Sequence, residues 1–363
     1  MMDWINSLTE SQQFLLFSAV KVLAGFSVLM GFVAYVVPLE RRLCAWMQDR
    51  IGPNRVGIPL TNIRIAGLGQ PLADALKSFL KEDYTPGHVR KVFYWLAPAI
   101  AMIPALLNLA VIPFGSHLGE QKMVVADLNV GILYTFGIVS LGVYGIVLAG
   151  YAANSKYPFL GGIRSSAQMI SYEIAMGMSV IPVFMLAGSL NLGDIVLEQR
   201  GVAWGFLPNW FVFQNPITFV CFFLFMVSSF AETNRTPFDL PEAEQELAGG
   251  YNVEYSSMKF AMFFMAEYAN LILASAMMTT LFLGGWTLPW FNLDQPASNV
   301  WIGLAHIGIF LAKMIALIVW FIWVRWMFPR FRYDQLMNLG WSRFLPLALV
   351  NIAVMAVWLW LNA

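Results

Sequence analysis

The chain has 363 residues, of which 59% are hydrophobic and 12% are charged, about half the roughly 25% charged share of a soluble domain. This composition excludes a water-soluble globule, a disordered chain and a secreted disulfide scaffold. Basic and acidic residues balance at 21 each, so no basic field indicates nucleic acid, and Cys44 and Cys221 are too few for an iron–sulfur cluster or a structural zinc site.

Eight apolar runs are long enough, or nearly so, to cross a bilayer. They lack the two-residue alternation of a β-barrel, so each is expected to be a helix. The sequence therefore predicts an all-α polytopic membrane protein that forms a single membrane domain over residues 1–363. The expected spans are 14–37, 92–114, 131–153, 170–190, 211–231, 260–283, 300–324 and 344–361.

The basic residues predict how these spans are oriented. Of the 21 Lys and Arg residues, 17 fall on alternate connections, whereas the connections between them hold only Lys122 and Arg200. Basic residues concentrate on the inner side of a membrane, so both termini are expected on the outer, periplasmic side. The long loops 38–91 and 232–259 are then expected on the inner side.

The first inner loop contains a pattern typical of an amphipathic helix. Leu68, Leu72, Leu76 and Leu80 recur every four residues, and charged residues occupy the opposite face. Such a helix is too charged to span the membrane, so we expect it to lie in the interface on the inner side. Packing of the same face against a partner protein is the alternative, and both can hold together.

Four ionisable residues lie inside the expected spans, where a charge is costly to insert and so indicates function. Lys21 and Glu173 fall near the expected span ends, from which their side chains could reach the interface. Glu267 and Lys313 lie deeper. A structural Glu267–Lys313 pair is one interpretation, and proton or ion handling is the other.

The loop between the fifth and sixth spans is unusually acidic. Pro237, Phe238 and Leu240 lie among its acids, which favours a folded loop over a solvated acidic face. Carboxylates this crowded raise one another's pKa, so some are expected to exchange protons as coupled sites. The acids are Glu232, Asp239, Glu242, Glu244, Glu246 and Glu254.

A basic cluster with a turn signal marks the inner end of the first span. Glu40-Arg41-Arg42 is followed by Arg50 and by the turn Gly52-Pro53-Asn54. Arginines at the mouth of a membrane site bind phosphates or lipid headgroups, or polarise a quinone carbonyl. Neither a Gly-rich nucleotide loop nor a cysteine cluster occurs in the sequence, so no cofactor is expected to be bound by this chain alone.

At these residues the sequence resembles the H-subunit family of the proton-pumping NADH–quinone oxidoreductase, respiratory complex I, whose mitochondrial member is called subunit 1. The resemblance follows the family's order over nearly the whole chain, although the segment 58–68 looks longer than the family's usual link. The matching stretches are Glu40-Arg41-Arg42, Gln48-Asp49-Arg50-Ile51-Gly52-Pro53-Asn54, Gln70-Pro71-Leu72-Ala73-Asp74, Ser171-Tyr172-Glu173, residues 231–239, Glu254-Tyr255, Glu267-Tyr268 and Pro329-Arg330-Phe331-Arg332-Tyr333-Asp334-Gln335-Leu336.

The resemblance implies a membrane subunit that forms much of a quinone chamber and couples quinone reduction to proton translocation. Quinone would be the substrate, while NADH, FMN and iron–sulfur clusters would belong to partner subunits. By motif, Arg41, Arg50, Arg235 and Arg325 would line the quinone passage. A charged path into the membrane would comprise Glu40, Asp74, Glu173, Glu232, Asp239, Glu242, Glu244, Glu246 and Glu267.

The resemblance also implies partners and a location. The expected partners are peripheral-arm subunits at the quinone site, small membrane subunits, antiporter-like subunits and membrane lipid, with no nucleic acid. The expected location is a bacterial inner membrane rather than the mitochondrial inner membrane. Two alternatives remain: the membrane component of an energy-converting hydrogenase, and a free-standing ion or proton transporter.

Overall fold

A computed structural model describes residues 9–57, 66–119, 121–203, 205, 207–240, 250–290 and 293–362. Over these residues the chain is almost entirely helical. The longer helices are α2 (Glu10–Met47), α3 (Gln70–Leu80), α4 (Lys91–Leu107), α5 (Gly131–Ala152), α6 (Lys156–Ala187), α9 (Pro216–Glu232), α10 (Ser257–Phe282), α11 (Val300–Met327) and α13 (Leu345–Asn362). The short elements are η1 (Asn108–Val111), α7 (Leu192–Glu198), α8 (Phe211–Gln214), α12 (Tyr333–Asn338), η3 (Leu339–Phe344), and two hairpins, β1 (His117–Leu118) with β2 (Gln121–Lys122) and β3 (Val202–Ala203) with β4 (Leu207–Pro208).

Each of the eight predicted apolar runs coincides with a helix. Seven helical segments in the described residues are long and apolar enough to cross a membrane, and the eighth, α9, is apolar but shorter. This confirms the helical, polytopic architecture, whereas the number of spans and the side on which each terminus lies stay predictions.

Two helix boundaries differ from those predicted by hydropathy. Helix α2 continues through Pro38 to Met47, so Glu40 and Arg41 lie on a helix rather than in the inner loop. Helix α6 begins at Lys156, which places Glu173 in mid-helix and not near the end of a span. Charged residues lower the mean hydropathy without interrupting the backbone hydrogen bonds of a helix, so hydropathy underestimates helix length at these positions.

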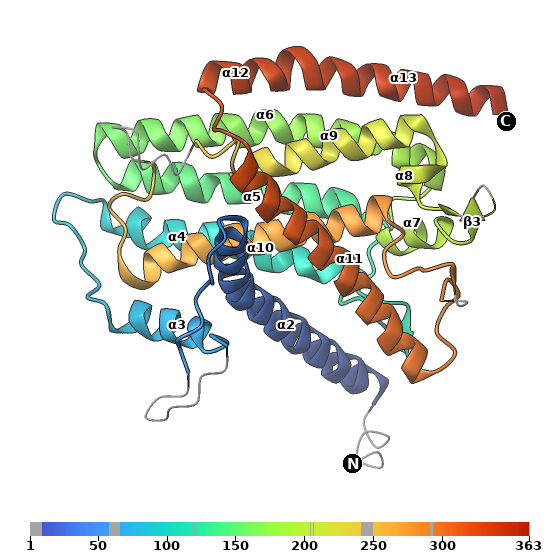
Figure 1. The fold of residues 1–363 in the computed structure, drawn as a ribbon, viewed down its shortest axis with the longest axis horizontal. Coiled ribbons are helices and arrows are strands. Elements are labelled where there is room, and N and C mark those ends of the chain that lie inside the picture. The colour runs from blue at the N-terminus through green and yellow to red at the C-terminus, as the bar shows by residue number, and fades with distance from the viewer. Residues whose placement is uncertain are drawn as a thin grey trace.

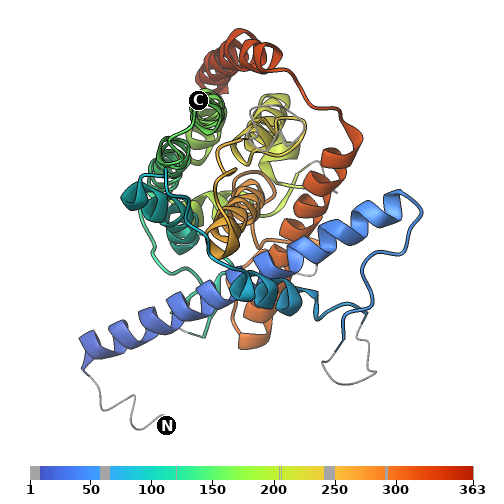
Figure 2. The ribbon, with the colours of Figure 1, turned by 90° about the vertical axis from the view of Figure 1, so that its left-hand side faces the viewer.

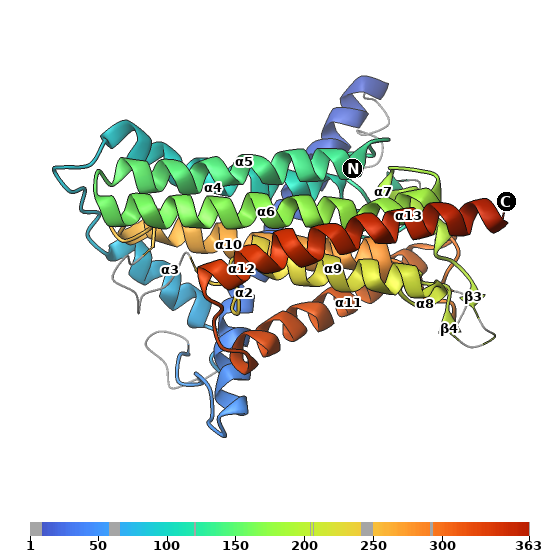
Figure 3. The same ribbon diagram turned by 90° about the horizontal axis from the view of Figure 1, so that it is seen from above.

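The helices form a bundle with two outlying members. Helices α4, α5, α6, α9 and α10 run side by side along the long axis, and α13 lies against α6 and α9 (Figure 1). Helices α2 and α11 cross the bundle obliquely, and α2 projects from its side when the bundle is viewed end-on (Figure 2). The connections α3–α4 and α5–α6 gather at one end, whereas α7, α8 and β3 lie at the other (Figure 3).

Helix α3 contacts α2 and α10 but lies outside the core. It contains no buried residue, and Leu72, Leu76 and Phe79 are all exposed. The side chain of Ser257, which begins α10, donates hydrogen bonds to the carbonyl oxygens of Ser78 and Lys81 at the end of α3. The expected amphipathic helix is therefore present, and the start of α10 fixes its C-terminal end.

Glycine allows α4 and α5 to approach closely. A Cβ atom at Gly145 would lie 2.7 Å from the backbone nitrogen of Ala101 in α4. Small residues at such crossings let the backbones of two helices come into contact. This close approach allows apolar helices to pack tightly within a membrane.

Candidate functional site

A buried cluster of charged residues lies where α2, the segment after α9, α10 and α11 meet. Its centre is Arg235, which follows α9 and is only 2% exposed. The Arg235 Nη1 atom lies 3.0 Å from Glu40 Oε2 on α2, and Nε lies 2.9 Å from Glu267 Oε1 on α10. One guanidinium thus joins carboxylates from two helices.

Two further side chains complete this cluster. The hydroxyl of Tyr268 donates a hydrogen bond of 2.8 Å to Glu40 Oε2, and the guanidinium of Arg235 lies over the Tyr268 ring at 4.3 Å. Arg325 on α11 donates to the other oxygen of Glu40. We call Glu40, Arg235, Glu267, Tyr268 and Arg325 the ionic cluster.

The charges of the ionic cluster balance. Two carboxylates face two guanidinium groups, and Arg325 is the more accessible of the two basic residues, with 24% of its side chain exposed. Burial alone would lower the pKa of Arg235, but Glu267 and Glu40 outweigh burial and hold this pKa above its ordinary value. A buried charge that loses its partner costs several kcal/mol, so each member depends on the others.

The described half of the acidic loop is folded against its own chain. The side-chain amide of Gln168 on α6 donates to the carbonyl oxygens of Ala231 and Phe238, both at 2.7 Å. Asp239 is 4% exposed and pairs with Arg330 at 2.8 Å. These contacts agree with the prediction of a folded loop. The salt bridge of Asp239 lies outside the ionic cluster.

Two small cavities lie within the bundle, and the first of them borders the ionic cluster. The first has about 30 Å³ open to the centres of water molecules and is lined by Glu267, Glu232 and Asn270. The second has about 40 Å³ and shares Glu232 and Asn270 with the first. Since one water needs roughly 10–15 Å³ by this measure, the first cavity can hold about two or three waters and the second about three or four.

The second cavity is lined mainly by apolar side chains, and a few polar side chains lie among them. Asn108 lines it, and both polar side-chain atoms of Asn108 are buried without a hydrogen-bond partner among the described residues. Buried amides are normally hydrogen-bonded to protein or to ordered water, so the cavity suits water. Glu173 lies nearby on α6 and accepts a hydrogen bond from Ser140 on α5.

Three of the predicted site residues lie at or near the surface, apart from the ionic cluster. Arg41 pairs with Asp74 on α3 at 2.8 Å, and both side chains are more than a third exposed. Arg50 is exposed and donates to Gln48. Of the remaining predicted acids, Glu242, Glu244 and Glu246 lie outside the described residues.

The interpretation of Glu267 and Lys313 as a structural pair is wrong. Glu267 is paired with Arg235. The Lys313 ammonium instead donates to the carbonyl oxygens of Leu283, Gly285 and Thr287 at 2.7, 2.9 and 2.7 Å, which follow the end of α10. Carbonyls at a helix C-terminus carry partial negative charge, so they stabilise this cation without a carboxylate.

Two side chains that belong to the candidate site were not among the predicted site residues. Tyr268 adds a donor to Glu40, and Gln168 fixes the acidic loop. In the sequence, each of these residues places a polar group within an apolar helix. A polar group that is buried there needs a hydrogen-bond partner. For Gln168 that partner lies 63 or more positions along the chain.

Comparison with known proteins gives matches over nearly the whole chain. The profile of the NADH dehydrogenase family matches residues 20–356. The first of the NADH-quinone oxidoreductase H subunits of Geobacter metallireducens is 49% identical over 338 residues, which cover 92% of this chain and 94% of that protein. The H subunit of Rhodospirillum rubrum is 50% identical over 328 residues, with 90% and 89% covered, and the H subunit of Flavobacterium psychrophilum is 44% identical over 351 residues, with 95% and 97% covered.

Proposed function

This chain belongs to the NADH dehydrogenase family as a relative of the H subunits of NADH-quinone oxidoreductases, and from that membership we propose that its ionic cluster couples quinone reduction to proton translocation. The resemblance read from the sequence is confirmed at the level of the family. The observation that carries the proposal is a balanced, buried set of charges whose Arg235 joins α2 to α10.

The proposed setting is a bacterial inner membrane with both termini on the outer side. The ionic cluster then lies toward the inner side, where the resemblance implies that peripheral subunits dock. Electrons would reach quinone from partner subunits that carry NADH, FMN and iron–sulfur clusters. Small membrane subunits and antiporter-like subunits would complete the membrane part of the assembly.

Quinone reduction changes charge and proton demand at the same place. A quinone that accepts two electrons becomes neutral quinol only when it also takes up two protons. Until then it carries negative charge, and a nearby guanidinium is the group best suited to stabilise that charge. Arg325 fits this role within the ionic cluster because its side chain is the most accessible of the four charged members.

Movement of Arg325 toward a reduced quinone would disturb Glu40. Glu40 accepts hydrogen bonds from Arg325, Arg235 and Tyr268, so loss of one partner leaves a buried carboxylate less neutralised. Such a carboxylate must regain a cation or take up a proton. This chain thereby converts a charge change at quinone into a proton event inside the protein.

The two cavities supply a route for the next step. Glu267 belongs both to the ionic cluster and to the first cavity, and Glu232 lines both cavities. Waters between carboxylates can pass protons along hydrogen bonds, and Glu173 extends the acidic series on α6. We propose that Glu267, Glu232 and Glu173 form the path from the ionic cluster into the membrane.

The test is acid-to-amide substitution in the assembled complex. We expect Glu267→Gln to lower quinone-linked NADH oxidation by tenfold or more, because it removes the charge that pairs with Arg235 and keeps the side-chain size. NADH oxidation with an artificial upstream acceptor should be unchanged. Asp334→Asn is the matched control, since Asp334 is an exposed acid paired locally with Arg332. Normal quinone-linked turnover in an assembled Glu267→Gln complex would remove the ionic cluster from the coupling path.

A further inference from the structure

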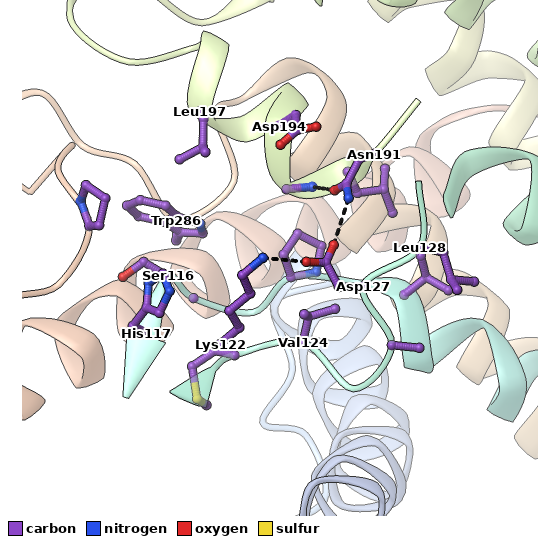
Figure 4. A pocket seen from close by; sticks show the side chains of 18 residues that line it. Ser116, His117, Lys122, Val124, Asp127, Leu128, Asn191, Asp194, Leu197 and Trp286 are labelled. Atoms are coloured by element: carbon purple, nitrogen blue, oxygen red, sulfur yellow. Dashed lines mark hydrogen bonds and ion pairs between the residues drawn. The ribbon is translucent and has the colours of Figure 1, made fainter. Parts of the chain in front are cut away.

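A pocket lies away from the ionic cluster, at the end of the bundle where α7 lies (Figure 1). It has about 120 Å³ open to the centres of water molecules. Its walls come from the β1–β2 hairpin, the start of α7 and the segment between α10 and α11 (Figure 4). This pocket has no part in the proposed coupling path, and we call it the outer pocket.

One wall of the outer pocket is charged. Lys122 Nζ lies 2.6 Å from Asp127 Oδ2, and the amide of Asn191 donates to the other oxygen of Asp127 at 2.7 Å (Figure 4). These hydrogen bonds from Lys122 and Asn191 hold the pKa of Asp127 below its ordinary value, so the carboxylate is ionised at neutral pH. Asp194 adds a second carboxylate to the lining.

The opposite wall contains an aromatic side chain and a buried imidazole nitrogen. Trp286 is only 3% exposed and lines the pocket together with His117. The Nδ1 atom of His117 is buried and has no hydrogen-bond partner within the described part of the chain. A polar group from outside the chain would satisfy this nitrogen.

The outer pocket lies at the level where several apolar helices end. Val111 closes the 3-10 turn after α4, α5 begins at Gly131, and Trp286 follows the end of α10 at Phe282. In a membrane protein the ends of spanning helices meet lipid headgroups, where Trp is enriched. This step rests on the proposed spanning orientation.

We propose that the outer pocket binds the zwitterionic phosphate–ammonium headgroup of a phospholipid of the phosphatidylethanolamine type. The charges are complementary: two carboxylates suit the primary ammonium, and one lysine suits the phosphate. Trp286 adds an aromatic side chain to the lining, and its ring lies against that of His306. The apolar lining, which includes Leu128 and Leu197, suits the glycerol and the first carbons of the acyl chains.

In the absence of lipid, Lys122 occupies the place of the ligand ammonium. Its side chain is 62% exposed, so it can turn from Asp127 toward a phosphate at the pocket mouth. Asp127 is then left for the ligand ammonium and keeps its bond from Asn191. Asp194, which accepts from Ser189, supplies the second carboxylate. The exchange replaces the Lys122–Asp127 ion pair by two pairs, Lys122 with the phosphate and Asp127 with the ligand ammonium.

The experiment uses the whole complex in phosphatidylcholine nanodiscs with a photoactivatable lipid. The probes are phosphatidylethanolamine and phosphatidylglycerol that carry the same diazirine near the glycerol. Labelled peptides are mapped by mass spectrometry. We expect phosphatidylethanolamine to label residues 111–128 and 191–197 about tenfold more than phosphatidylglycerol, because only the former offers an ammonium for charged hydrogen bonds.

Two variants separate the roles of the charged residues. Asp194→Asn should reduce phosphatidylethanolamine labelling several-fold and leave phosphatidylglycerol labelling unchanged. Lys122→Gln should reduce labelling by both lipids, because both contain the phosphate. Asp334→Asn, at an exposed site outside the pocket lining, is the control, and all variants should retain upstream NADH oxidation and full assembly.

Three results would overturn the proposal. Equal labelling by the two lipids would show that the ammonium is not recognised. Labelling that ignores both variants would place the lipid outside the outer pocket. Displacement of the lipid probe by an equal concentration of free phosphoethanolamine would identify a soluble ligand rather than a lipid. These results leave the proposed function untouched, because it is tested by quinone-linked turnover of Glu267→Gln.

Discussion

Arg235 is the residue through which the segments of the ionic cluster are joined. It is almost fully buried, and its guanidinium touches carboxylates that lie on α2 and α10. A lysine would be a poor substitute, because a single ammonium lacks the planar set of donors that serves two carboxylates at once. Arg325 forms its salt bridge with Glu40 from a partly exposed position at the side of the cluster.

This difference predicts unequal costs for two similar substitutions. Arg235→Gln leaves Glu40 and Glu267 buried without the guanidinium between them, which should cost about 3–5 kcal/mol of stability. Arg325→Gln should cost less, since Glu40 keeps Arg235 and Tyr268. Thermal unfolding and the amount of complex on native gels measure both. Equal losses in the two variants would contradict the central role of Arg235, and Arg235→Gln with Glu267→Gln should recover part of the loss.

The carboxylate shared by the two cavities gives a second prediction at this scale. Glu232→Gln should lower proton translocation and quinone-linked turnover tenfold or more, because a neutral amide cannot take up and release a proton in the path. The measurements are NADH-driven proton uptake in vesicles and NADH:quinone activity. Glu198→Gln, at an exposed site on α7, is the control. A normal proton gradient in assembled Glu232→Gln would rule out Glu232 as a carrier.

At the scale of helices, close packing of α4 and α5 depends on one glycine. Gly145 and Gly137 both lie on α5, but a Cβ at Gly145 would meet the α4 backbone, whereas a Cβ at Gly137 has no heavy atom within 4 Å. The two glycines therefore lie on the same helix, so the change in helix propensity on substitution by alanine is the same, but only Gly145 is packed against a neighbouring helix. They form a matched pair for a test of helix association.

We expect Gly145→Ala to destabilise the protein by about 1–3 kcal/mol, the usual cost of forcing bulk into a packed interface. Gly137→Ala should be neutral or slightly stabilising, because alanine favours helix over glycine. Thermal melting of the purified protein in detergent compares the two variants. A neutral Gly145→Ala would mean that α4 and α5 separate readily, and that their contact is not a fixed part of the bundle.

The elements themselves were largely predictable from the sequence, because apolar length identifies helices of membrane-spanning size. Helix ends were less predictable. Helix α6 begins well before its apolar run, so Glu173 lies in mid-helix, whereas the sequence had placed it near the end of a span. The partners of charged residues were not predictable by spacing. Lys313 donates its hydrogen bonds to backbone carbonyl oxygens, and any residue type can supply such a carbonyl, so the sequence does not reveal these partners.

The candidate site was predicted in its parts but not in its connections. Glu40, Arg235, Glu267 and Arg325 were each selected from the sequence, through burial cost or through the resemblance. Their assembly into one cluster depends on how α2 and α11 cross the bundle, which periodicity does not encode. The same crossing leaves Asp74 and Arg41 paired at an exposed position outside the cluster.

For the whole molecule, the proposed orientation predicts opposite labelling of two positions. In a chain whose Cys44 and Cys221 are replaced by serine, Glu198→Cys should react with a membrane-impermeant thiol reagent in intact cells, because α7 is proposed to lie outside. Lys81→Cys should react only in inverted vesicles, since α3 is proposed to lie on the inner side. Both positions are exposed, so accessibility within the protein is matched. The reverse pattern would invert the proposed topology.

The long-range pairing of Glu40 also has a consequence for biogenesis. Glu40 and Arg325 are separated by 285 positions in the chain, and Glu40 and Arg235 by 195. At a synthesis rate of about 5–20 residues per second, roughly 15–60 s pass between the appearance of Glu40 and that of Arg325. Arg235 appears about 10–40 s after Glu40, and only before that point does the first helix carry a carboxylate with neither counter-ion. A nascent chain that stops before α11 has Arg235 but not Arg325, so only one of the two salt bridges of Glu40 can form, and completion of both distinguishes a finished protein from a fragment.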